Sequence, residues 1–448
     1  MTDSPLQHAE AIFRAGLARV DPLAMMARTL RLEGRVLVVE TEGNRAAFDL
    51  DRFRTLTVTG MGKASARMAL GLERLLGDRI DGGLVAVKSG HVEPLARIRL
   101  LEAAHPVPDA TSVQAAEAIL ALAAGCDADT LAISLISGGG SAITCAPSPG
   151  LSLDDKQDVT RLLLGCGATI HELNAVRKHL SRIKGGRLAR AFAPATCLSL
   201  LLSDVVGDDL DIIASGPTVA DPSSFAEALA ILGRYRLEDR IPRNALDLLL
   251  EGAAGKREET AKPGDPCLAR MHNVLLGTNH QALLSAERKA QELGYHTLVL
   301  TARLAGEARE AAQLLLGIAE DIATRGFPLA RPACLIAGGE TTVTLRGSGK
   351  GGRNQEMALA WLDAMRRSPA SRDLTLLAAS TDGNDGPTDA AGAFASHGIL
   401  RRALALGLDP HAYLADNDSY AFHAGAGSLL KTGPTNTNVS DMAILLVP

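Results

Sequence analysis

Residues Thr130–Ala142 read TLAISLISGGGSA, and this stretch decides the fold. The apolar run Leu131–Ile136 predicts a short buried strand. It leads directly into Ser-Gly-Gly-Gly-Ser, where three successive glycines remove every Cβ from the turn. Successive backbone N–H groups at such a turn can form a concave site for a phosphate or a carboxylate. A tight turn that binds no ligand is the alternative interpretation.

The same pattern of apolar runs and longer helical segments continues along the chain. It predicts βαβ units, an α/β fold class and largely parallel sheets covered by helices on both faces. Ligands bind such sheets beyond the carboxyl ends of the strands. The expected strands are Arg35–Glu40, Thr55–Thr59, Gly83–Lys88, Leu131–Ile136, Thr196–Leu202, Thr297–Thr301, Cys334–Ala337, Leu374–Ser380 and Ala443–Val447. The expected helices are Lys63–Leu76, Thr111–Ala124, Asp154–Leu164, Asn174–Phe192, Gln281–Leu293, Ala305–Arg325 and Arg353–Arg366.

The length of the chain predicts two domains, because 448 residues exceed what one hydrophobic core normally serves. The clearest break in composition is Gly252–Pro266, GAAGKREETAKPGDP. We interpret it as an exposed connection between an N-terminal domain, residues 1–251, and a C-terminal domain, residues 267–448. A long surface loop inside one domain is the alternative.

Composition narrows the classes of partner. A net charge of −5 and an aromatic content of 3% argue against nucleic-acid binding, which needs basic surfaces and stacking platforms. Six cysteines without a CxxC pair predict reduced thiols in a cytoplasmic protein. No apolar run approaches the roughly 18 residues of a membrane helix, and the N-terminus has the pattern of an amphipathic helix rather than a signal peptide. We therefore expect small-molecule partners, and a homo-oligomer is compatible with the sequence.

A second strand-to-glycine turn, Leu56–Ser65, reads LTVTGMGKAS. It is not a Walker A loop, because Thr57 stands where the first glycine should be. It also departs from the dinucleotide fingerprint, because the third glycine position is Ser65. The remaining signal is Lys63 at the start of a helix, where a cation opposes the helix dipole unless an anion lies between them. A solvated surface lysine is the alternative.

The C-terminal half repeats the signal in Cys334–Thr341, CLIAGGET, and in Gly347–Glu356, GSGKGGRNQE. The second stretch opens a predicted helix and places Arg353 in its first turn. Arginine recognises phosphate and carboxylate groups in a planar, bidentate way that lysine cannot reproduce. So much glycine beside positive charge indicates a ligand loop.

Carboxylates follow two other predicted strands. Asp204 and Asp208 lie in SDVVGDD, and Asp382 lies in STDGNDGPTD. Mg²⁺ that carries nucleotide phosphates uses one or two such carboxylates and several waters. Each aspartate is an equally good turn former. The basic segment from Asn174 predicts one helix kinked at two glycines, with Asn174 and Lys178 near its start, where an anion could reach them.

These stretches together resemble the glycerate 2-kinase family, the kind without a Walker A loop, over nearly the whole chain. The resemblance rests on VTGMGKASARMA, SGGGSA, LNAVRKHLSRIKGGRLA, SDVVGDDLDIIASGPT, IAGGET, GKGGRNQEMALA and STDGNDGPTDAAGA. It implies a larger N-terminal Rossmann-like domain and a smaller C-terminal α/β domain, with the active site in the cleft between them. It also implies phosphorylation of D-glycerate at the 2-hydroxyl, with ATP and Mg²⁺.

The resemblance assigns Lys63 and Arg353 as the central catalytic pair. Asp204 and Asp208 are the first candidates for Mg²⁺, and Asp382 is the second. Candidate residues for phosphate or substrate are Ser137, Gly138, Gly139, Gly140, Ser141, Asn174, Lys178, Gly338, Gly339, Glu340 and Asn354. The alternatives are a hydroxypyruvate or tartronate semialdehyde reductase that uses NAD(P)H, a name that members of the family also carry, and a non-catalytic sensor on the same fold.

Overall fold

The structure is a computed structural model that describes residues 4–41 and 43–448, and it divides into two compact units. Met25–Leu276 form one, here called the inserted unit. The chain up to Ala24 and Gly277–Pro448 form the other, here called the terminal unit. Two α/β units confirm the expected fold class. The division differs from the expected boundaries at the N-terminus and at residues 252–266.

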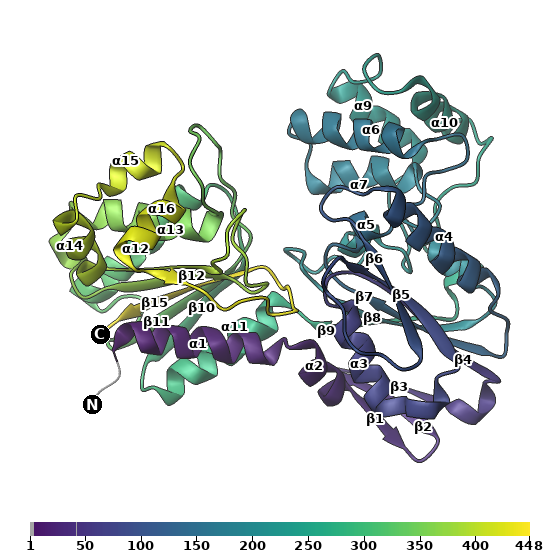
Figure 1. Ribbon diagram of the computed structural model, residues 1–448, viewed down its shortest axis with the longest axis horizontal. Helices are drawn as coiled ribbons and strands as arrows, with labels where there is room; N and C mark the ends of the chain where they lie inside the picture. Colours follow the sequence, from purple (N-terminus) through teal and green to yellow (C-terminus); the bar gives the residue numbers. More distant parts are fainter. Residues whose placement is uncertain (1–3, 42) are drawn as a thin grey trace. The chain divides into compact units, whose positions relative to one another are not determined.

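Helix α1 (Pro5–Arg19) belongs to the terminal unit although it precedes the inserted unit in sequence (Figure 1). Its Ile12 and Phe13 are completely buried. Ser285 Oγ donates to the carbonyl of Ala15 at 3.1 Å, and Thr437 Oγ1 donates to the carbonyl of Val20 at 2.6 Å. The helix therefore completes a core made mainly by the C-terminal half.

Residues 252–266, expected to link the domains, pack inside the inserted unit. The Ala261 N–H donates to Gly185 O at 3.0 Å, and the Asp221 N–H donates to Ala261 O at 2.8 Å. The chain instead passes between the units within α2 (Pro22–Thr29) and after Leu276.

The inserted unit is built on a sheet of order β6-β5-β4-β7-β8-β9. Pairing is parallel from β6 through β8, which confirms the expected parallel sheet. Strand β7 is buried at every residue, as TLAISLI predicts. The strands are β4 (Thr55–Met61), β5 (Gly82–Lys88), β6 (Ile98–Ala103), β7 (Thr130–Ile136), β8 (Thr196–Leu202) and β9 (Met271–Gly277). An antiparallel meander precedes them: β1 (Leu30–Glu33), β2 (Val36–Thr41) and β3 (Asn44–Asp49).

Helices of the inserted unit cover the sheet and also form a second apolar cluster of their own, around α6, α7, α9 and α10 (Figure 1). The expected single helix over Asn174–Phe192 is wrong. Helix α7 ends at His179, and Ser181 then forms a β-bridge with Pro147. Gly185 and Gly186 follow with left-handed φ of 59° and 72°, and α8 begins after them at Arg187. The helices are α3 (Ser65–Leu76), α4 (Ala110–Ala124), α5 (Gly140–Ile143), α6 (Leu153–Gly165), α7 (Ile170–His179), α8 (Arg187–Phe192), α9 (Phe225–Arg234) and α10 (Arg243–Ala253).

The terminal unit has a mixed sheet of order β10-β11-β15-β12-β13-β14. Among the described residues, β10 and β11 pair in parallel and the other neighbouring strands pair antiparallel, so the expectation of a largely parallel sheet is wrong here. The reason is topological: the last strand inserts between β11 and β12, and a loop rather than a crossover helix joins β12 to β13. The strands are β10 (His296–Leu304), β11 (Ala333–Gly339), β12 (Thr375–Ser380), β13 (Gly392–Ser396), β14 (Leu429–Leu430) and β15 (Asp441–Val447).

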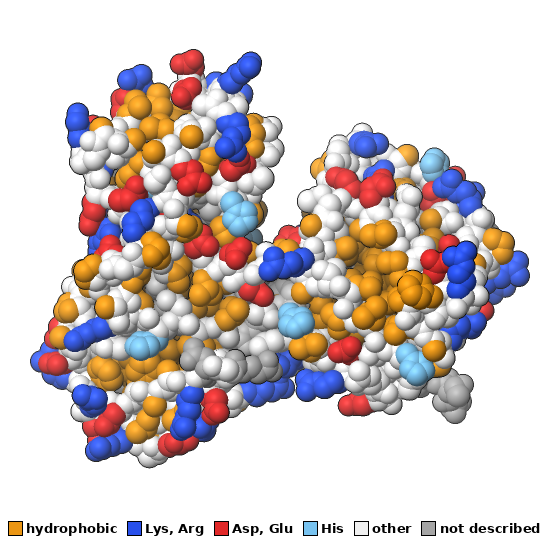
Figure 2. All heavy atoms as spheres, turned by 180° about the vertical axis from the view of Figure 1, so that it is seen from behind, with side chains coloured by type: hydrophobic (Ala, Val, Ile, Leu, Met, Phe, Trp, Pro, Cys, Tyr) orange, Lys and Arg blue, Asp and Glu red, His pale blue; other side chains and the backbone are white. Residues whose placement is uncertain are grey.

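The core of the terminal unit lies between this sheet and α12–α13, where Trp361 is completely buried. The helices are α1, α11 (Asn279–Glu292), α12 (Ala308–Arg325), α13 (Arg353–Met365), α14 (His397–Ala405), α15 (Pro410–Ala415) and α16 (Ser419–Ala426). Figure 2 shows acidic and basic side chains intermixed on the visible face. None of the helices in the described residues has the length and the apolar character that a membrane span requires.

Candidate active site

In the inserted unit, the candidate residues follow four parallel strands and lie at the same edge of the sheet. Lys63 follows β4, the glycine loop Ser137–Ser141 follows β7, and Asp204 follows β8. His105 follows β6 and was not predicted, because the sequence did not reveal that strand. Carboxyl ends of adjacent parallel strands meet at one edge, which is where ligands bind in α/β sheets.

The three glycines allow side chains to lie directly on the loop. A Cβ on Gly138 would stand 2.1 Å from Asp204 Oδ2, and one on Gly140 would stand 3.0 Å from Met61 Cγ. Gly139 has φ of 81°, and its Cβ would lie 3.1 Å from the His105 ring and 3.2 Å from Lys63 Cγ. The loop therefore gathers a lysine, a histidine and a carboxylate around bare backbone.

The Lys63 turn is closed against Ser137. The Lys63 N–H donates to Gly138 O at 2.9 Å, and the Ala64 N–H donates to Ser137 Oγ at 3.1 Å. Position 62 requires glycine, because a Cβ there would be only 2.2 Å from Ser137 Oγ. A dinucleotide-binding turn needs such N–H groups for the pyrophosphate, and here they are already used within the protein.

Ser141 is surrounded by cations. Lys184 Nζ donates to Ser141 Oγ at 2.6 Å and to its carbonyl at 2.9 Å, and Arg177 Nη2 donates to Ser141 Oγ at 2.9 Å. Ser215 Oγ lies 2.9 Å from Ser141 Oγ and donates to Asn174 Oδ1 at 2.8 Å. Asn174 thus positions a hydroxyl of this cluster.

Lys156, Arg177 and Lys184 form a basic cluster. Lys156 is 6% exposed, and its Nζ has no hydrogen-bond partner among the described residues. Burial, with the nearby Arg177 and Arg187, lowers the Lys156 pKa to about 8. Burial and neighbouring cations also hold the Lys184 pKa well below its usual range. No carboxylate forms an ion pair with any of the three within the described residues. Such a cluster favours a bound anion.

Sequence reasoning missed Lys156, because it lies in an ordinary amphipathic helix, α6. It missed Ser215 for a different reason: only the backbone reveals it. Ala214 and Ser215 adopt φ of 50° and 63°, uncommon for residues other than glycine. Strained backbone of this kind concentrates at functional sites.

Lys178 is placed differently from the expectation. It lies near the end of α7 rather than near its start, because the helix begins at Ile170. Its Nζ is 2.8 Å from Asp211 Oδ2 and 3.1 Å from Asp221 Oδ1, and its side chain is 2% exposed. This is a buried ion pair, which indicates a structural role.

Asp208, like Asp204, lies in the segment after β8, and its φ is 61°. Within residues 4–41 and 43–448, no three His, Cys, Asp or Glu side chains gather as a metal site. Mg²⁺ rarely uses an all-protein cage, and one or two carboxylates with substrate phosphates and waters suffice. The donor set at Asp204 and Asp208 fits that requirement.

In the terminal unit, Arg353 occupies the first turn of α13, as predicted. Its guanidinium forms a bidentate pair with Asp441, with Nη2 at 3.0 Å from Oδ1, and Nη1 is 2.8 Å from Glu340 Oε1. These carboxylates raise the pKa of Arg353 above its usual range against the effect of burial. The sequence did not indicate Asp441, which is 88 residues away.

Asn354 and the buried Asp385 fix the start of α13. Asn354 N and Nδ2 donate to Asp385 Oδ1 at 3.1 and 3.2 Å, and the Gln355 N–H donates to Oδ2 at 2.8 Å. Burial and the charge of Asp441 raise the pKa of Asp385 to about 6. Asn354 is therefore held by a carboxylate rather than offered to solvent.

Gly338 and Gly339, expected in a turn, are the last buried residues of β11. A Cβ on Gly338 would be 2.0 Å from Asn279 Oδ1, an atom without a hydrogen-bond partner among the described residues.

Asp382 Oδ1 accepts from Ser380 Oγ at 3.0 Å and from the Asn384 N–H at 2.9 Å. That oxygen stabilises the turn after β12.

The glycines of GSGKGG have a structural explanation. The N–H groups of Ser348 and Lys350 donate to Asp416 Oδ1 at 2.9 Å and to Asp418 Oδ1 at 3.0 Å. A Cβ on Gly349 would stand 2.4 Å from Asp418 Cβ. This loop packs against residues 416–418, and those N–H groups are bound within the protein.

Comparison with known proteins identifies the family of this chain. A model described as a domain of unknown function, DUF4147, matches residues 8–250, and the MOFRL family model matches residues 333–441. A glycerate 2-kinase of Pyrococcus horikoshii is 40% identical over 391 residues, covering 87% of each chain. The chain belongs to the glycerate 2-kinase family. Another relative, from Agrobacterium vitis and provisionally named hydroxypyruvate reductase, is 41% identical and covers 99% of this chain and 95% of its own.

A solved structure supports the same family membership. The crystal structure of a glycerate kinase from Thermotoga maritima matches with a TM-score of 0.84 and 36% identity, covering 99% of both chains. The similarity to this structure therefore extends over nearly the whole chain.

Proposed function

We propose that this protein catalyses the ATP-dependent phosphorylation of D-glycerate at its 2-hydroxyl, giving 2-phosphoglycerate and ADP. The observation that carries the proposal is the glycine loop with Lys63 at the sheet edge, beside Lys156, Arg177 and Lys184, which form no ion pair with a carboxylate in the described part of the chain. Both substrates are anions, and phosphoryl transfer needs mainly positioning and neutralisation of charge. The names of the relatives support the same reaction.

Each group of residues has a distinct proposed role. Lys63 and Arg353 neutralise the transferring phosphoryl group, while the glycine loop and Ser141, held by Arg177 and Lys184, bind a phosphate or the glycerate carboxylate. The 2-hydroxyl oxygen forms a bond to the γ-phosphorus, and the bond from that phosphorus to the bridging oxygen of ADP breaks.

Asp204 and Asp208 would hold Mg²⁺, with Asp382 as the second candidate. When bound, the ion would offset negative charge on the ATP phosphates. Asp204 suits this role because its carboxylate lies over Gly138, next to the loop proposed to bind phosphate. The six cysteines are free, which supports the proposed cytoplasmic location.

One relative's provisional name, hydroxypyruvate reductase, makes that activity the second candidate. A nicotinamide dinucleotide would need N–H groups at the Lys63 turn, and those of Lys63 and Ala64 are bound to Gly138 and Ser137. This observation favours the kinase over the reductase.

The deciding experiment supplies D-glycerate, ATP and Mg²⁺ and identifies the product. Formation of 2-phosphoglycerate is expected, detected by its direct conversion in an enolase-coupled assay. A parallel reaction contains hydroxypyruvate with NADH or NADPH. Steady oxidation of the nicotinamide without glycerate phosphorylation would replace the kinase proposal by the reductase, and 3-phosphoglycerate as the product would overturn the assigned position.

A further inference from the structure

The inserted unit contains a cavity whose lining includes none of the residues proposed above for catalysis. Its volume is about 490 Å³, within the range of small-molecule sites. Residues from α7, α8, α9, α10 and the connecting segments line it. The lining residues used below are Ser148, Arg182, Arg187, Arg190, Arg257 and Glu258.

The charged lining is strongly unbalanced toward arginine. Four arginines face one acidic residue, Glu258. Three of these arginines have carboxylate partners: Arg182 pairs with Glu117, Arg190 with Glu258 and Asp265, and Arg257 with Glu251. Several of these pairs are solvent-exposed, so they contribute little stability and can exchange with a ligand.

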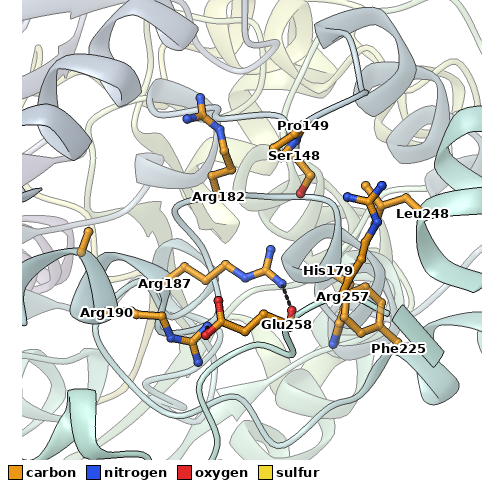
Figure 3. A pocket seen from close by; sticks show the side chains of 11 residues that line it. Ser148, Pro149, His179, Arg182, Arg187, Arg190, Phe225, Leu248, Arg257 and Glu258 are labelled. Carbon is orange, nitrogen blue, oxygen red and sulfur yellow. Dashed lines mark hydrogen bonds and ion pairs between the residues drawn. The ribbon is translucent and has the colours of Figure 1, made fainter. Parts of the chain in front are cut away.

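Arg187 differs from the other three because no carboxylate of the described residues forms an ion pair with it. Its guanidinium donates to two backbone carbonyls, those of Ser181 and, at 3.2 Å, Glu258. Burial and the nearby Arg190 lower the pKa of Arg187. In Figure 3 this guanidinium is directed into the space between the lining residues.

Ser148 is a second, independent sign of a ligand. It is 4% exposed, and its Oγ has no hydrogen-bond partner among the described residues. Figure 3 shows the Ser148 hydroxyl pointing into the same space as Arg187. A buried hydroxyl without a partner costs free energy that a bound acceptor would recover.

We propose that this cavity binds a small organic phosphate, with the phosphate on Arg187, Arg257 and Ser148. Guanidinium groups match the geometry of phosphate oxygens. Pro149, Phe225 and Leu248 line the remaining wall and would contact an apolar or aromatic body of the ligand.

The test is calorimetric titration of the full-length protein with phenyl phosphate, without ATP or glycerate. Arg187→Gln and Arg257→Gln should each weaken binding by about 10-fold or more, the size expected for a lost charged hydrogen bond. Ser148→Ala should weaken it less. Arg243→Gln is the matched control, because Arg243 is exposed, pairs with Asp247 and does not line the cavity.

Two further arms separate this site from the proposed catalytic residues and from other anions. Lys63→Ala should retain the binding, and benzoate should bind more weakly than phenyl phosphate. Arg187 also holds two carbonyls, so thermal unfolding checks that Arg187→Gln is folded, and Arg257→Gln carries the test if it is not. Unchanged affinity in both arginine variants, loss of binding in Lys63→Ala, or equal affinity for benzoate would overturn the proposal. Because no kinase substrate is present, failure here leaves the proposed reaction intact.

Discussion

The two glycine-rich loops of this protein look alike in sequence and differ in physical role. Gly138–Gly140 carries the side chains of Asp204, His105 and Lys63 on its bare backbone, beside Lys156, Arg177 and Lys184. The N–H groups of Ser348 and Lys350, in the loop before Arg353, are bound by Asp416 and Asp418. Beside the first loop, Lys156, Arg177 and Lys184 form no ion pair with a carboxylate of the described residues, whereas the second loop precedes an arginine held by two carboxylates.

The difference teaches that glycine beside positive charge has two causes. A loop that must pack against a neighbouring segment needs glycine as much as a loop that must approach a ligand. The counter-ions distinguish the two kinds of loop. A buried cation without a carboxylate partner favours the binding of an anionic ligand, whereas a cation paired with carboxylates has its side chain already held in position. In this protein, Lys156 represents the first case and Arg353 the second.

The largest effect is expected for the two proposed catalytic cations. Lys63→Ala and Arg353→Ala should each lower the rate of ATP-dependent glycerate phosphorylation by about 10²–10⁵-fold, as for other groups that stabilise transition-state charge. The coupled assay measures this loss. Arg234→Gln is the control, because Arg234 is 64% exposed in its pair with Glu172. Near-normal turnover in either alanine variant would refute that residue's assignment.

Methionine substitutions contrast the unpaired and the paired cation. Lys156→Met should stabilise the protein at pH 7 by about 2–3 kcal/mol, because the folded state then buries one positive charge fewer. Arg353→Met should destabilise it by about 2–3 kcal/mol, because it leaves Asp441 unpaired. Urea unfolding midpoints would test both. Destabilisation by Lys156→Met would show that Lys156 has a partner in solution.

The pH dependence sharpens this comparison. The folded pKa of Lys156 is about 8, below its usual 10.5. Below the folded-state pKa, Lys156 is protonated in both the folded and the unfolded protein. The folded state then bears the full free-energy cost of burying this charge. As pH rises from about 8 to 10.5, the unfolded state holds more protons, so stability rises with pH. Lys156→Met should remove this rise, and an unchanged pH profile would argue against the lowered pKa.

Alanine at one glycine of each loop should separate activity from stability. Gly138→Ala would push Asp204 from its position and should mainly lower activity, because a carboxylate side chain can move. Gly349→Ala would meet Asp416 O at 2.6 Å, backbone that cannot yield easily, and should mainly lower stability, by about 1–3 kcal/mol. Activity and thermal unfolding are measured on both, and the reverse pattern would exchange the roles assigned to the loops.

The smallest effect is expected for serine hydroxyls. Ser141→Ala removes an oxygen that accepts from Lys184 and Arg177 and should cost about 1 kcal/mol, with a higher KM for glycerate. Ser348→Ala should change neither the stability nor the KM for glycerate, because Ser348 interacts with Asp416 through its backbone N–H. Equal KM values for the two variants would remove Ser141 from the substrate site.

Much of the fold follows from local pattern, and much of the site does not. Strand β7 and the positions of Lys63, Asp204 and Arg353 after strands or at a helix start could be predicted, because they depend on neighbouring residues. The environment of Arg353 could not be, since Asp441 lies 88 residues away and on the last strand. The end of α7 at His179 could not be predicted either, because the segment after it pairs with Pro147, which is distant in the sequence from Ser181.

The placement of α1 has a consequence for biosynthesis. Both α1 and β15 belong to the terminal unit, so that unit can complete its core only after β15 has been synthesised. Met25–Leu276 emerges as one continuous stretch and can fold while translation proceeds. Until the C-terminal half has emerged, Ile12 and Phe13 of the nascent α1 lack their final neighbours, and we expect chaperones to bind this helix.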